Sequence, residues 1–178
     1  GALTGHTATS LAVGNNHTCA VLDNGTLACW GWNWSGELGT DEAPMGPWGP
    51  NSTVPLVVTG GALAGHAVTG VAGGQQFTCA SLDVGSVACW GWNAYGQLGD
   101  GSTTDSSTPV LAAADALNGE AVVALSNGDE YNCALLSNAG VACWGMNYYG
   151  QLGNGAAPTP APAASGHIGP SGAPAGVN

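Results

Sequence analysis

The feature that most constrains the fold is a short segment that the chain repeats three times. It reads TCAVLDNGTLACWGWN at residues 18–33, TCASLDVGSVACWGWN at residues 78–93 and NCALLSNAGVACWGMN at residues 132–147. Self-similarity at this spacing is typical of solenoids, propellers and repeat arrays, because one such unit cannot bury its apolar face alone. The sequence therefore predicts three repeat units and a tail rich in Pro, Ala and Gly. Their bounds are 1–60, 61–114, 115–155 and, for the tail, 156–178.

The pattern within each unit is that of β-structure. Short apolar runs such as HTCAVL and TLACWGW are bounded by Gly, Asn, Asp or Pro, as strands usually are, and no segment keeps helical periodicity over a long stretch. The 31 glycines in 178 residues also indicate many turns. Four such runs in a unit of roughly fifty residues are typical of a propeller blade. We expect an all-β chain of three four-stranded antiparallel blades, forming a partial propeller or an open array.

The two central runs of each unit predict a hairpin. Val84 in the middle of the second turn resists positive φ, which argues against a two-residue type I′ turn. A three-residue turn with Gly25 or Gly85 in the left-handed conformation fits both of the first two units. In the third unit the glycine stands one position later, so Asn138 or Ala139 must adopt the turn conformation.

This register places the two cysteines of each unit opposite each other on neighbouring strands. A structural zinc site usually needs closely spaced cysteine pairs, and a redox centre needs close spacing too, whereas these lie ten positions apart. Disulfides are the simplest interpretation, with buried free thiols as the alternative. Each disulfide would stabilise the fold by roughly 2–3 kcal/mol and would persist outside the cytosol, which favours an extracellular protein. The expected pairs are Cys19–Cys29, Cys79–Cys89 and Cys133–Cys143.

The charge balance excludes two classes of partner. The chain has no Lys or Arg and 11 Asp and Glu, which gives a formal net charge of −11. Binding of nucleic acid or of anionic lipid depends on cationic side chains, so we expect neither. The apolar runs are too short for a transmembrane helix, so we expect no insertion into a membrane.

The repeats resemble a known family. The segments GNNHTCAVLDNGTLACWGWNWSGELG, GGQQFTCASLDVGSVACWGWNAYGQLG and NGDEYNCALLSNAGVACWGMNYYGQLG are similar to the regulator of chromosome condensation repeat. The resemblance covers the chain up to its Pro-rich tail and implies blades of four antiparallel strands, which close into a seven-bladed ring in the founding family. The cysteine-containing variant is most similar to secreted bacterial forms.

Aromatic side chains are the candidate contact residues. Tryptophans 30, 90 and 144 share one position in the three units, and tryptophans 32 and 92 share another, so we expect both positions to be packed in the core. Other rings fall in loops, where exposed rings could stack on sugars or bury against a neighbouring subunit. These loop residues are Trp34, Trp48, Tyr95, Tyr148 and Tyr149.

Other candidate sites are fewer. His17 occupies the position of Phe77 and Tyr131, which favours a packed ring over catalysis, and we expect neither catalytic residues nor a cofactor. Loop carboxylates such as Asp100 and Asp105 are more consistent with solvated side chains than with a calcium site. Four Asn-x-Ser/Thr sequences could carry glycans, and they begin at Asn16, Asn24, Asn33 and Asn51.

The function expected from these features is structural. Three blades cannot close a seven-bladed ring, so both terminal blades expose apolar faces that favour association with further copies. Pro158, Pro160 and Pro162 fall where the fourth strand of the third blade should be, and they leave amide donors on one edge only, so this segment can pair on one side. We also expect the tail to dock on a neighbour. The sequence predicts a non-enzymatic extracellular protein that self-assembles into a surface or filament. The alternative is a binding module that recognises glycan or protein through its blade loops.

Overall fold

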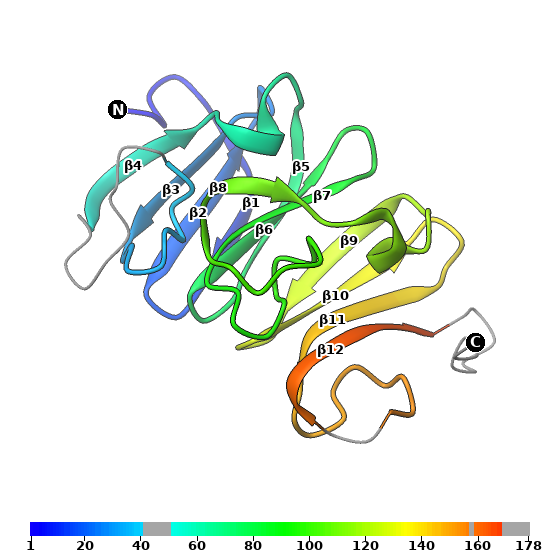
Figure 1. Ribbon diagram of the computed structural model, residues 1–178. Helices are drawn as coiled ribbons and strands as arrows, with labels where there is room; N and C mark the ends of the chain where they lie inside the picture. Colours follow the sequence, from blue (N-terminus) through cyan, green and yellow to red (C-terminus); the bar gives the residue numbers. More distant parts are fainter. Residues whose placement is uncertain (41–50, 157–158, 169–178) are drawn as a thin grey trace.

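The computed structural model describes residues 1–40, 51–156 and 159–168, and it contains three antiparallel sheets of four strands each (Figure 1). The first sheet consists of β1 (Ala8–Val13), β2 (His17–Leu22), β3 (Leu27–Gly31) and β4 (Ser52–Val58). The second consists of β5 (Val68–Gly73), β6 (Phe77–Leu82), β7 (Val87–Gly91) and β8 (Ser106–Leu111). The third consists of β9 (Val122–Asn127), β10 (Tyr131–Leu136), β11 (Val141–Asn147) and β12 (Thr159–Ile168). The predicted all-β fold with three four-stranded blades is confirmed.

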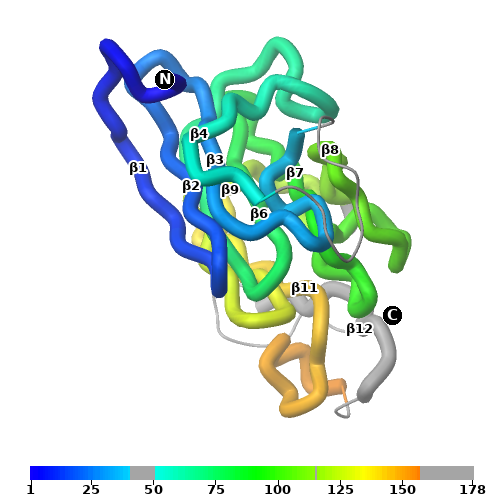
Figure 2. Tube along the Cα trace, turned by 90° about the vertical axis from the view of Figure 1, so that its left-hand side faces the viewer, coloured from blue at the N-terminus to red at the C-terminus, as the bar shows by residue number. Residues whose placement is uncertain are grey.

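The three sheets are arranged as consecutive blades. Within each blade the strands pair in the order of the sequence, and the first strands β1, β5 and β9 lie side by side (Figures 1 and 2). Short 3-10 turns, η1 (Gly61–Leu63) and η2 (Ala114–Leu117), precede the second and the third blade. Each blade is thus built from one continuous unit of the repeat.

The third blade is completed by β12, where the prolines of the sequence placed its fourth strand. β12 pairs with β11 of the same chain, with Ala142 opposite His167 and Asn147 opposite Thr159. The predicted boundary at residue 155 is therefore too early, because part of the segment assigned to the tail is the fourth strand of this blade. One edge of that strand pairs within the chain, and docking of the tail on a neighbour stays a prediction. The remaining tail, residues 169–178, lies outside the described residues.

The hydrophobic core lies between the blades. Strands of each blade contribute one face to each contact, and equivalent positions recur in both contacts. The core between blades one and two contains Cys19, Val21, Leu27, Cys29, Leu38, Val58, Leu63, Val68, Ala80, Leu82, Ala88 and Trp90. The core between blades two and three contains Phe77, Cys79, Val87, Cys89, Leu98, Ala112, Leu117, Ala134, Leu136, Ala142 and Trp144. Stability therefore depends on blade-to-blade packing, as in other repeat proteins.

The hairpin register agrees with the sequence in all three units. The paired cysteines face each other across β2–β3, β6–β7 and β10–β11, and the structure contains three disulfides, each with a Cα–Cα distance of 4.1 Å. The turns contain Gly25 at φ 77° and Gly85 at φ 79°, and Ala139 takes the same place in unit three at φ 64°. The expected non-glycine residue in the third turn is therefore Ala139.

Replacing Ala139 with glycine should stabilise the protein. An alanine in the left-handed region costs about 1 kcal/mol or more that glycine does not, although glycine gains more entropy in the unfolded chain. We expect a net gain of about 0.5–1 kcal/mol in the free energy of unfolding, measured by urea denaturation. The matched control is Gly25→Ala, which should lose stability because Gly25 has the same positive φ. A loss of stability in Ala139→Gly would contradict the argument.

Candidate binding surfaces

The register of the strands gives the molecule two distinct ends. The loops that follow β3, β7 and β11 lie beside the loops that precede β2, β6 and β10, because Trp32, Trp92 and Met146 donate their backbone N–H to residues 16, 76 and 130. The hairpin turns at residues 23–26, 83–86 and 137–140 lie at the opposite end of the strands. We call these the aromatic end and the hairpin end. The aromatic end is defined by Trp32, Trp34, Trp92, Tyr95, Tyr148 and Tyr149.

One loop structure recurs three times at the aromatic end. In blade two the Oδ1 atom of Asn93 accepts the backbone N–H of Leu98 at 2.9 Å, and the Oε1 atom of Gln97 accepts that of Tyr95 at 2.8 Å. The asparagine and the leucine are buried, which anchors the loop to the core. These two side-chain-to-backbone hydrogen bonds, which we call the bonded frame, hold the ring between them outward. The equivalent bonds use Asn33, Leu38, Glu37 and Ser35 in blade one, and Asn147, Leu152, Gln151 and Tyr149 in blade three.

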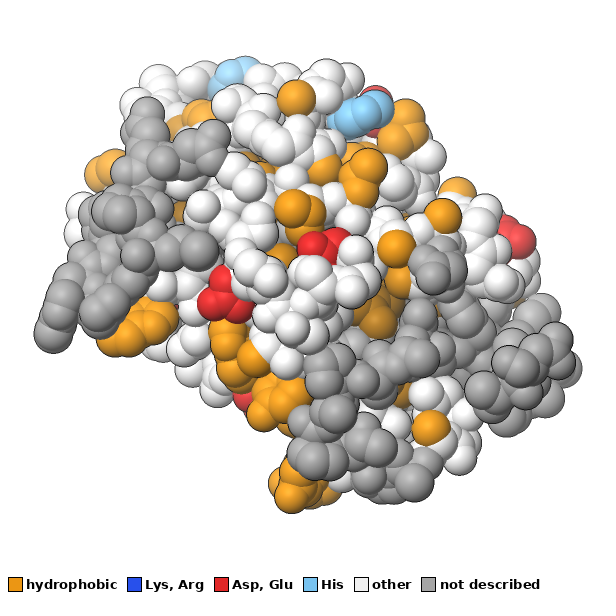
Figure 3. Space-filling model, in the orientation of Figure 1, with side chains coloured by type: hydrophobic (Ala, Val, Ile, Leu, Met, Phe, Trp, Pro, Cys, Tyr) orange, Lys and Arg blue, Asp and Glu red, His pale blue; other side chains and the backbone are white. Residues whose placement is uncertain are grey.

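Each blade presents a pair of rings on this frame. Trp32 and Trp34 stack in parallel with centroids 5.9 Å apart, and Tyr148 and Tyr149 meet edge to face at 5.2 Å. Trp34 and Tyr149 are 40% and 82% exposed. Hydrophobic side chains gather along the lower edge of the molecule in Figure 3, where Figure 1 places these loops. The rings of the aromatic end thus form a series across three blades.

The ring of Trp92 completes the series by meeting that of Tyr95 edge to face, with centroids 5.5 Å apart. The structure therefore brings together four of the five predicted loop aromatics, while Trp48 lies outside the described residues. The expectation that Trp32 is packed in the core is wrong, because this ring is exposed beside Trp34.

The carboxylates of the aromatic end differ in their surroundings. Asp100 accepts from Ser102, and Asp105 accepts the backbone N–H of Asn93 at 2.8 Å, so both hold their own loop in place. Asp129 is exposed in the loop before β10, and no hydrogen bond to its carboxylate is seen among the described residues. Burial raises the pKa of the neighbouring Glu130, and the charge of Asp129 raises it further. Asp129 and Glu130 are thus the carboxylates available for a partner.

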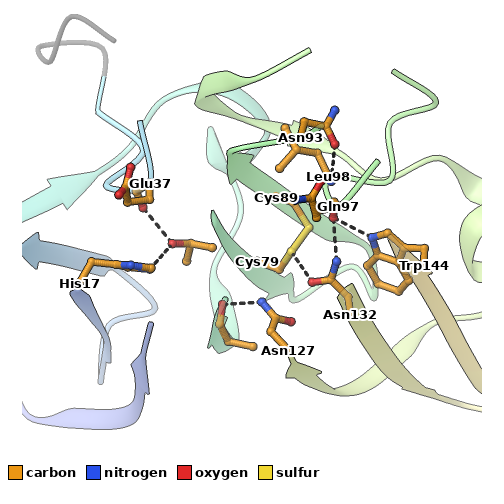
Figure 4. Close-up of a disulfide and its surroundings, with 12 residues drawn as sticks. His17, Glu37, Cys79, Cys89, Asn93, Gln97, Leu98, Asn127, Asn132 and Trp144 are labelled. Atoms are coloured by element: carbon orange, nitrogen blue, oxygen red, sulfur yellow. Dashed lines mark hydrogen bonds between the residues drawn. A yellow bond between two sulfur atoms is a disulfide. The ribbon is translucent and has the colours of Figure 1, made fainter. Parts of the chain in front are cut away.

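The blades are joined by a repeated set of polar bonds (Figure 4). The indole Nε1 of Trp90 donates to the backbone carbonyl of Glu37 in the preceding blade at 2.9 Å, and Thr78 Oγ1 donates to the same carbonyl at 2.8 Å. In the next joint Trp144 Nε1 donates to the carbonyl of Gln97 at 2.9 Å, and Asn132 Nδ2 donates to it at 2.7 Å. Two donors from one blade therefore bind one buried carbonyl of the blade before it.

The terminal blades present the two halves of this joint separately. Trp30 is half-buried in the position where Trp90 and Trp144 are fully buried, because no blade among the described residues packs on this face. At the other end Gln151 is half-buried, whereas Glu37 and Gln97 are 0% exposed. The expectation that all three tryptophans are packed in the core therefore holds fully for the second and third.

His17 also belongs to the joint between blades one and two. Its Nε2 lies 2.9 Å from Thr78 Oγ1, and that hydroxyl donates its hydrogen to the carbonyl of Glu37. His17 must therefore donate from Nε2, which fixes the tautomer. Burial lowers the pKa of His17 to about 4, so the ring is neutral near pH 7. The ring is packed as its equivalence with Phe77 predicted, and its Nε2 also bonds to Thr78, which that equivalence did not predict.

Glu37 is the one carboxyl in the frame position that other blades fill with glutamine. Its side chain is 0% exposed, and burial raises its pKa to about 7. Oε2 accepts the backbone N–H of Ser35 at 2.7 Å, while Oε1 has no hydrogen-bond partner within the described part of the chain. Folding therefore favours the protonated form of this carboxyl.

We expect Glu37→Gln to lack the loss of stability that the wild type undergoes as the pH rises to neutral. Because the folded pKa is raised, the stabilisation from this group is complete below pH 4.5 and is lost as the pH rises through about 7. The difference in free energy of unfolding between pH 4 and pH 8 should fall by about 3 kcal/mol in the variant, as urea denaturation at the two pH values would measure. The matched control is Gln97→Glu, which should increase the difference in free energy of unfolding between pH 4 and pH 8 by a similar amount. Equal pH dependence in wild type and Glu37→Gln would contradict the raised pKa.

The hairpin end carries polar pairs that connect each turn to the segment before the first strand. His6 Nδ1 lies 2.9 Å from Asp23 Oδ1, and His66 Nδ1 lies 3.3 Å from Asp83 Oδ1. The hydrogen bond from His6 lowers the pKa of Asp23. In the third blade both partners change together, and Ser137 Oγ donates to Glu120 Oε2 at 2.7 Å. These exposed pairs are structural.

The four predicted glycosylation sites differ in accessibility. Asn16, Asn24 and Asn51 are exposed, so a glycan on their side chains is compatible with the fold. Asn33 is 1% exposed, and its Oδ1 accepts the backbone N–H of Leu38 at 3.0 Å. A glycan at Asn33 is therefore incompatible with the folded loop. Glycosylation of the other three stays a prediction.

Metal clusters and membrane-spanning helices are both absent from the described residues. No group of three or more His, Cys, Asp or Glu side chains there could hold a metal ion. No helix in these residues is long and apolar enough to cross a membrane.

Comparison with known proteins identifies the repeat. The family model for the regulator of chromosome condensation (RCC1) repeat matches residues 8–37, 68–97 and 122–151, and a second model of the same repeat matches residues 85–135. These segments begin at the first strand of each blade and end in the glutamate or glutamine of the bonded frame. The chain belongs to the RCC1 repeat family. The resemblance drawn from the three sequence segments is confirmed.

RCC1 relatives among characterised proteins are much longer than this chain. The ultraviolet-B receptor UVR8 of Arabidopsis thaliana is 33% identical over 145 residues, which cover 82% of this chain and 31% of the receptor. The human E3 ubiquitin-protein ligase HERC2 is 34% identical over 79% of this chain and 3% of the ligase. The chain thus spans about a third or less of these relatives.

Solved structures support the same fold. Human WBSCR16 superposes with a TM-score of 0.73 at 25% identity, over 85% of this chain and 37% of that protein. Prp20p of Saccharomyces cerevisiae, which was studied for its binding to Gsp1p and histones, superposes with a TM-score of 0.72 at 18% identity. The match to Prp20p covers 84% of this chain and 36% of that protein. Both superpositions show the RCC1 β-propeller fold.

The sequence pattern missed the polar residues of the joint. Thr18, Thr78 and Asn132 stand next to the first cysteine of each unit, on a mainly apolar strand. A polar residue recurring at such a position indicates a conserved bond within the repeat, and this signal could have been used. No comparable pattern in the sequence predicts the burial of Glu37, because the segment Ser-Gly-Glu-Leu-Gly is equally consistent with an exposed loop.

Proposed function

We propose that this chain is a non-enzymatic extracellular building block that assembles with further copies of itself, as a surface or filament subunit. The observation that supports this proposal is the repeated joint, in which a tryptophan and a short polar side chain bind one carbonyl of the preceding blade. Trp30 and Thr18 offer the donor half of a further joint, and Gln151 offers the acceptor half.

The donor half on blade one and the acceptor half on blade three correspond to the two sides of the joints within the chain. Leu135 is 43% exposed on the outer face of blade three, while Val21 in the equivalent position of blade one is 2% exposed in the first joint. Apolar surface is thus uncovered beside the acceptor half on blade three, and Leu11 and Val13 of β1 are exposed on blade one. Association of one chain's first blade with another chain's third blade would bury both sets. Such a head-to-tail contact produces a ring or a filament.

The three disulfides support the extracellular location. They lie between strands of stable hairpins, and structural disulfides of this kind persist in oxidising compartments. A chain without Lys or Arg also offers no cleavage site to trypsin-like proteases.

The test is the oligomeric state of the full chain across a concentration series, measured by sedimentation velocity and negative-stain electron microscopy. The wild type should form rings or filaments, and Trp30→Ala should shift the population to monomers because it removes the donor at the joint. Trp34→Ala is the matched control, since it removes an exposed tryptophan from the aromatic end, and it should assemble as the wild type does. Dispersed wild-type monomers at high concentration would refute the proposal.

The second candidate function is that of a binding module. The observation that favours it is the series of exposed ring pairs at the aromatic end, which the core does not require. Related RCC1 proteins with this fold include Prp20p, studied for its binding to Gsp1p and histones, which makes a protein partner the natural class. Glycan recognition is the other class that exposed rings favour.

A further inference from the structure

The aromatic end combines exposed rings with negative charge and has no positive charge. The whole chain lacks Lys and Arg, so no side chain other than a protonated histidine can neutralise its carboxylates. Rings attract cations through their electron-rich faces, and carboxylates attract the same cations by charge. A surface that presents both is complementary to Lys or Arg side chains.

At the boundary between blades two and three, a ring and a carboxylate occupy the positions of two residues that touch at the boundary between blades one and two. In the preceding boundary, Ser35 Oγ donates to Gln76 Oε1 at 3.2 Å. Tyr95 occupies the place of Ser35 one blade later, and Glu130 occupies the place of Gln76. The repeat therefore brings the ring of Tyr95 and the carboxylate of Glu130 to the same boundary.

A hollow lies next to this boundary. It has a volume of about 270 Å³ and is formed by the loops before β2, β6 and β10, with Asn15, Gln75 and Asp129 at equivalent positions in its wall. Asp129 is the one charged residue in the described lining. The volume of the hollow exceeds that of a Lys or Arg side chain, and its wall presents a carboxylate.

We propose that the aromatic end binds a protein segment that carries lysine or arginine side chains. One cationic side chain enters the hollow beside Asp129, and another lies over the rings of Tyr95 and Trp92 near Glu130. This interaction is separate from the blade-to-blade joint, because it uses loop residues at the end of the strands rather than the faces of the terminal blades. A neutral glycan would use the rings but would leave both carboxylates unpaired.

The charge of the whole chain acts in the same direction. A formal net charge of −11 attracts cationic partners over a distance of several ångströms and repels acidic ones. Attraction of this kind weakens as salt is added, whereas stacking on sugars depends little on salt. Salt dependence therefore separates the two kinds of ligand.

The experiment is biolayer interferometry with the full chain coupled through its N-terminal amine. This is the only amine in a chain without lysine, and it precedes β1 at the hairpin end, away from the proposed site. The probes are a Gly-Ser peptide with interspersed arginines, the same peptide with glutamates in place of the arginines, and a chitin oligosaccharide. We expect binding of the arginine peptide alone, with an affinity that falls as salt is raised.

The variants test the site itself. Asp129→Asn combined with Glu130→Gln should weaken binding of the arginine peptide about tenfold, and Tyr95→Ala should weaken it about threefold. The matched control is Asp83→Asn combined with Glu120→Gln, which removes the same charge at the hairpin end and should leave the affinity within about twofold. Thermal unfolding of each variant checks that the fold is retained.

Three outcomes would overturn the proposal. Equal weakening by the two double variants would show attraction by net charge without a site. Equal binding of the arginine and glutamate peptides would exclude cation recognition. Binding of the oligosaccharide alone would assign the aromatic end to glycans. Each of these results is distinguishable from a failure of self-assembly, which depends on Trp30 and not on these residues.

Discussion

Trp90→Ala is expected to destabilise the protein by about 4 kcal/mol, while Trp30→Ala costs the isolated chain about 1–2 kcal/mol. The two tryptophans occupy the same position in consecutive units, but Trp90 is fully buried between blades and Trp30 is half-buried on the open face. Truncation of a fully buried ring removes its apolar contacts and leaves a cavity, whereas truncation at an open face leaves a surface that water can fill.

A second variant removes the polar bond of the joint together with only part of its packing. Trp90→Phe keeps a ring but removes the Nε1 donor, so the carbonyl of Glu37 keeps only the bond from Thr78. We expect a loss of about 1–2 kcal/mol for this variant, since the acceptor remains partly satisfied. Urea denaturation at low protein concentration measures all three variants without interference from assembly. A loss for Trp30→Ala as large as that for Trp90→Ala would contradict the assignment of Trp30 to an open face.

Removal of the second disulfide should cost about 4 kcal/mol. The Cys79–Cys89 bond closes a loop with a sequence separation of 10, for which chain entropy alone gives about 3 kcal/mol. Both sulfurs are also 0% exposed in the core between blades two and three, so the double alanine variant loses packing as well. The total should therefore exceed the entropic contribution.

The third disulfide is the matched control for this experiment. Cys133–Cys143 has the same sequence separation, but Cys133 is half-buried because no fourth blade covers it within the described residues. We expect about 3 kcal/mol for its removal, so the two double variants should differ by about 1 kcal/mol in the free energy of unfolding. Free-thiol titration verifies that the remaining cysteines stay paired. A larger cost at Cys133–Cys143 than at Cys79–Cys89 would contradict the location of the core.

The sequence alone predicted the local structure with few errors. The runs HTCAVL and FTCASL coincide with β2 and β6, and the turn glycines and Ala139 adopt the conformation that the register required. These features depend on residues close in sequence, where alternation and turn chemistry act directly. The fourth strand of the third blade was expected at the prolines, where β12 pairs with β11, but the predicted unit boundary at residue 155 left it in the tail.

The candidate surfaces were predicted less completely. Loop position was enough to predict that four rings are contact residues, because a ring outside the strands need not pack in the core. These rings are Trp34, Tyr95, Tyr148 and Tyr149. Trp32 was assigned to the core on recurrence alone, yet it is exposed beside Trp34. Recurrence shows that a position matters to the repeat, but it does not show which side of the loop frame the ring lies on.

The sequence by itself determined the repeat, the hairpin register and the pairing of the six cysteines, since each follows from spacing within one unit. The tertiary structure alone decided how the units meet: that Trp90 and Thr78 bind the carbonyl of Glu37, that the Glu37 side chain is buried, and that Trp30 is left half-covered. The physical reason is that a blade buries its apolar face only against another blade. Which atoms are buried therefore depends on the neighbour that each face has in space.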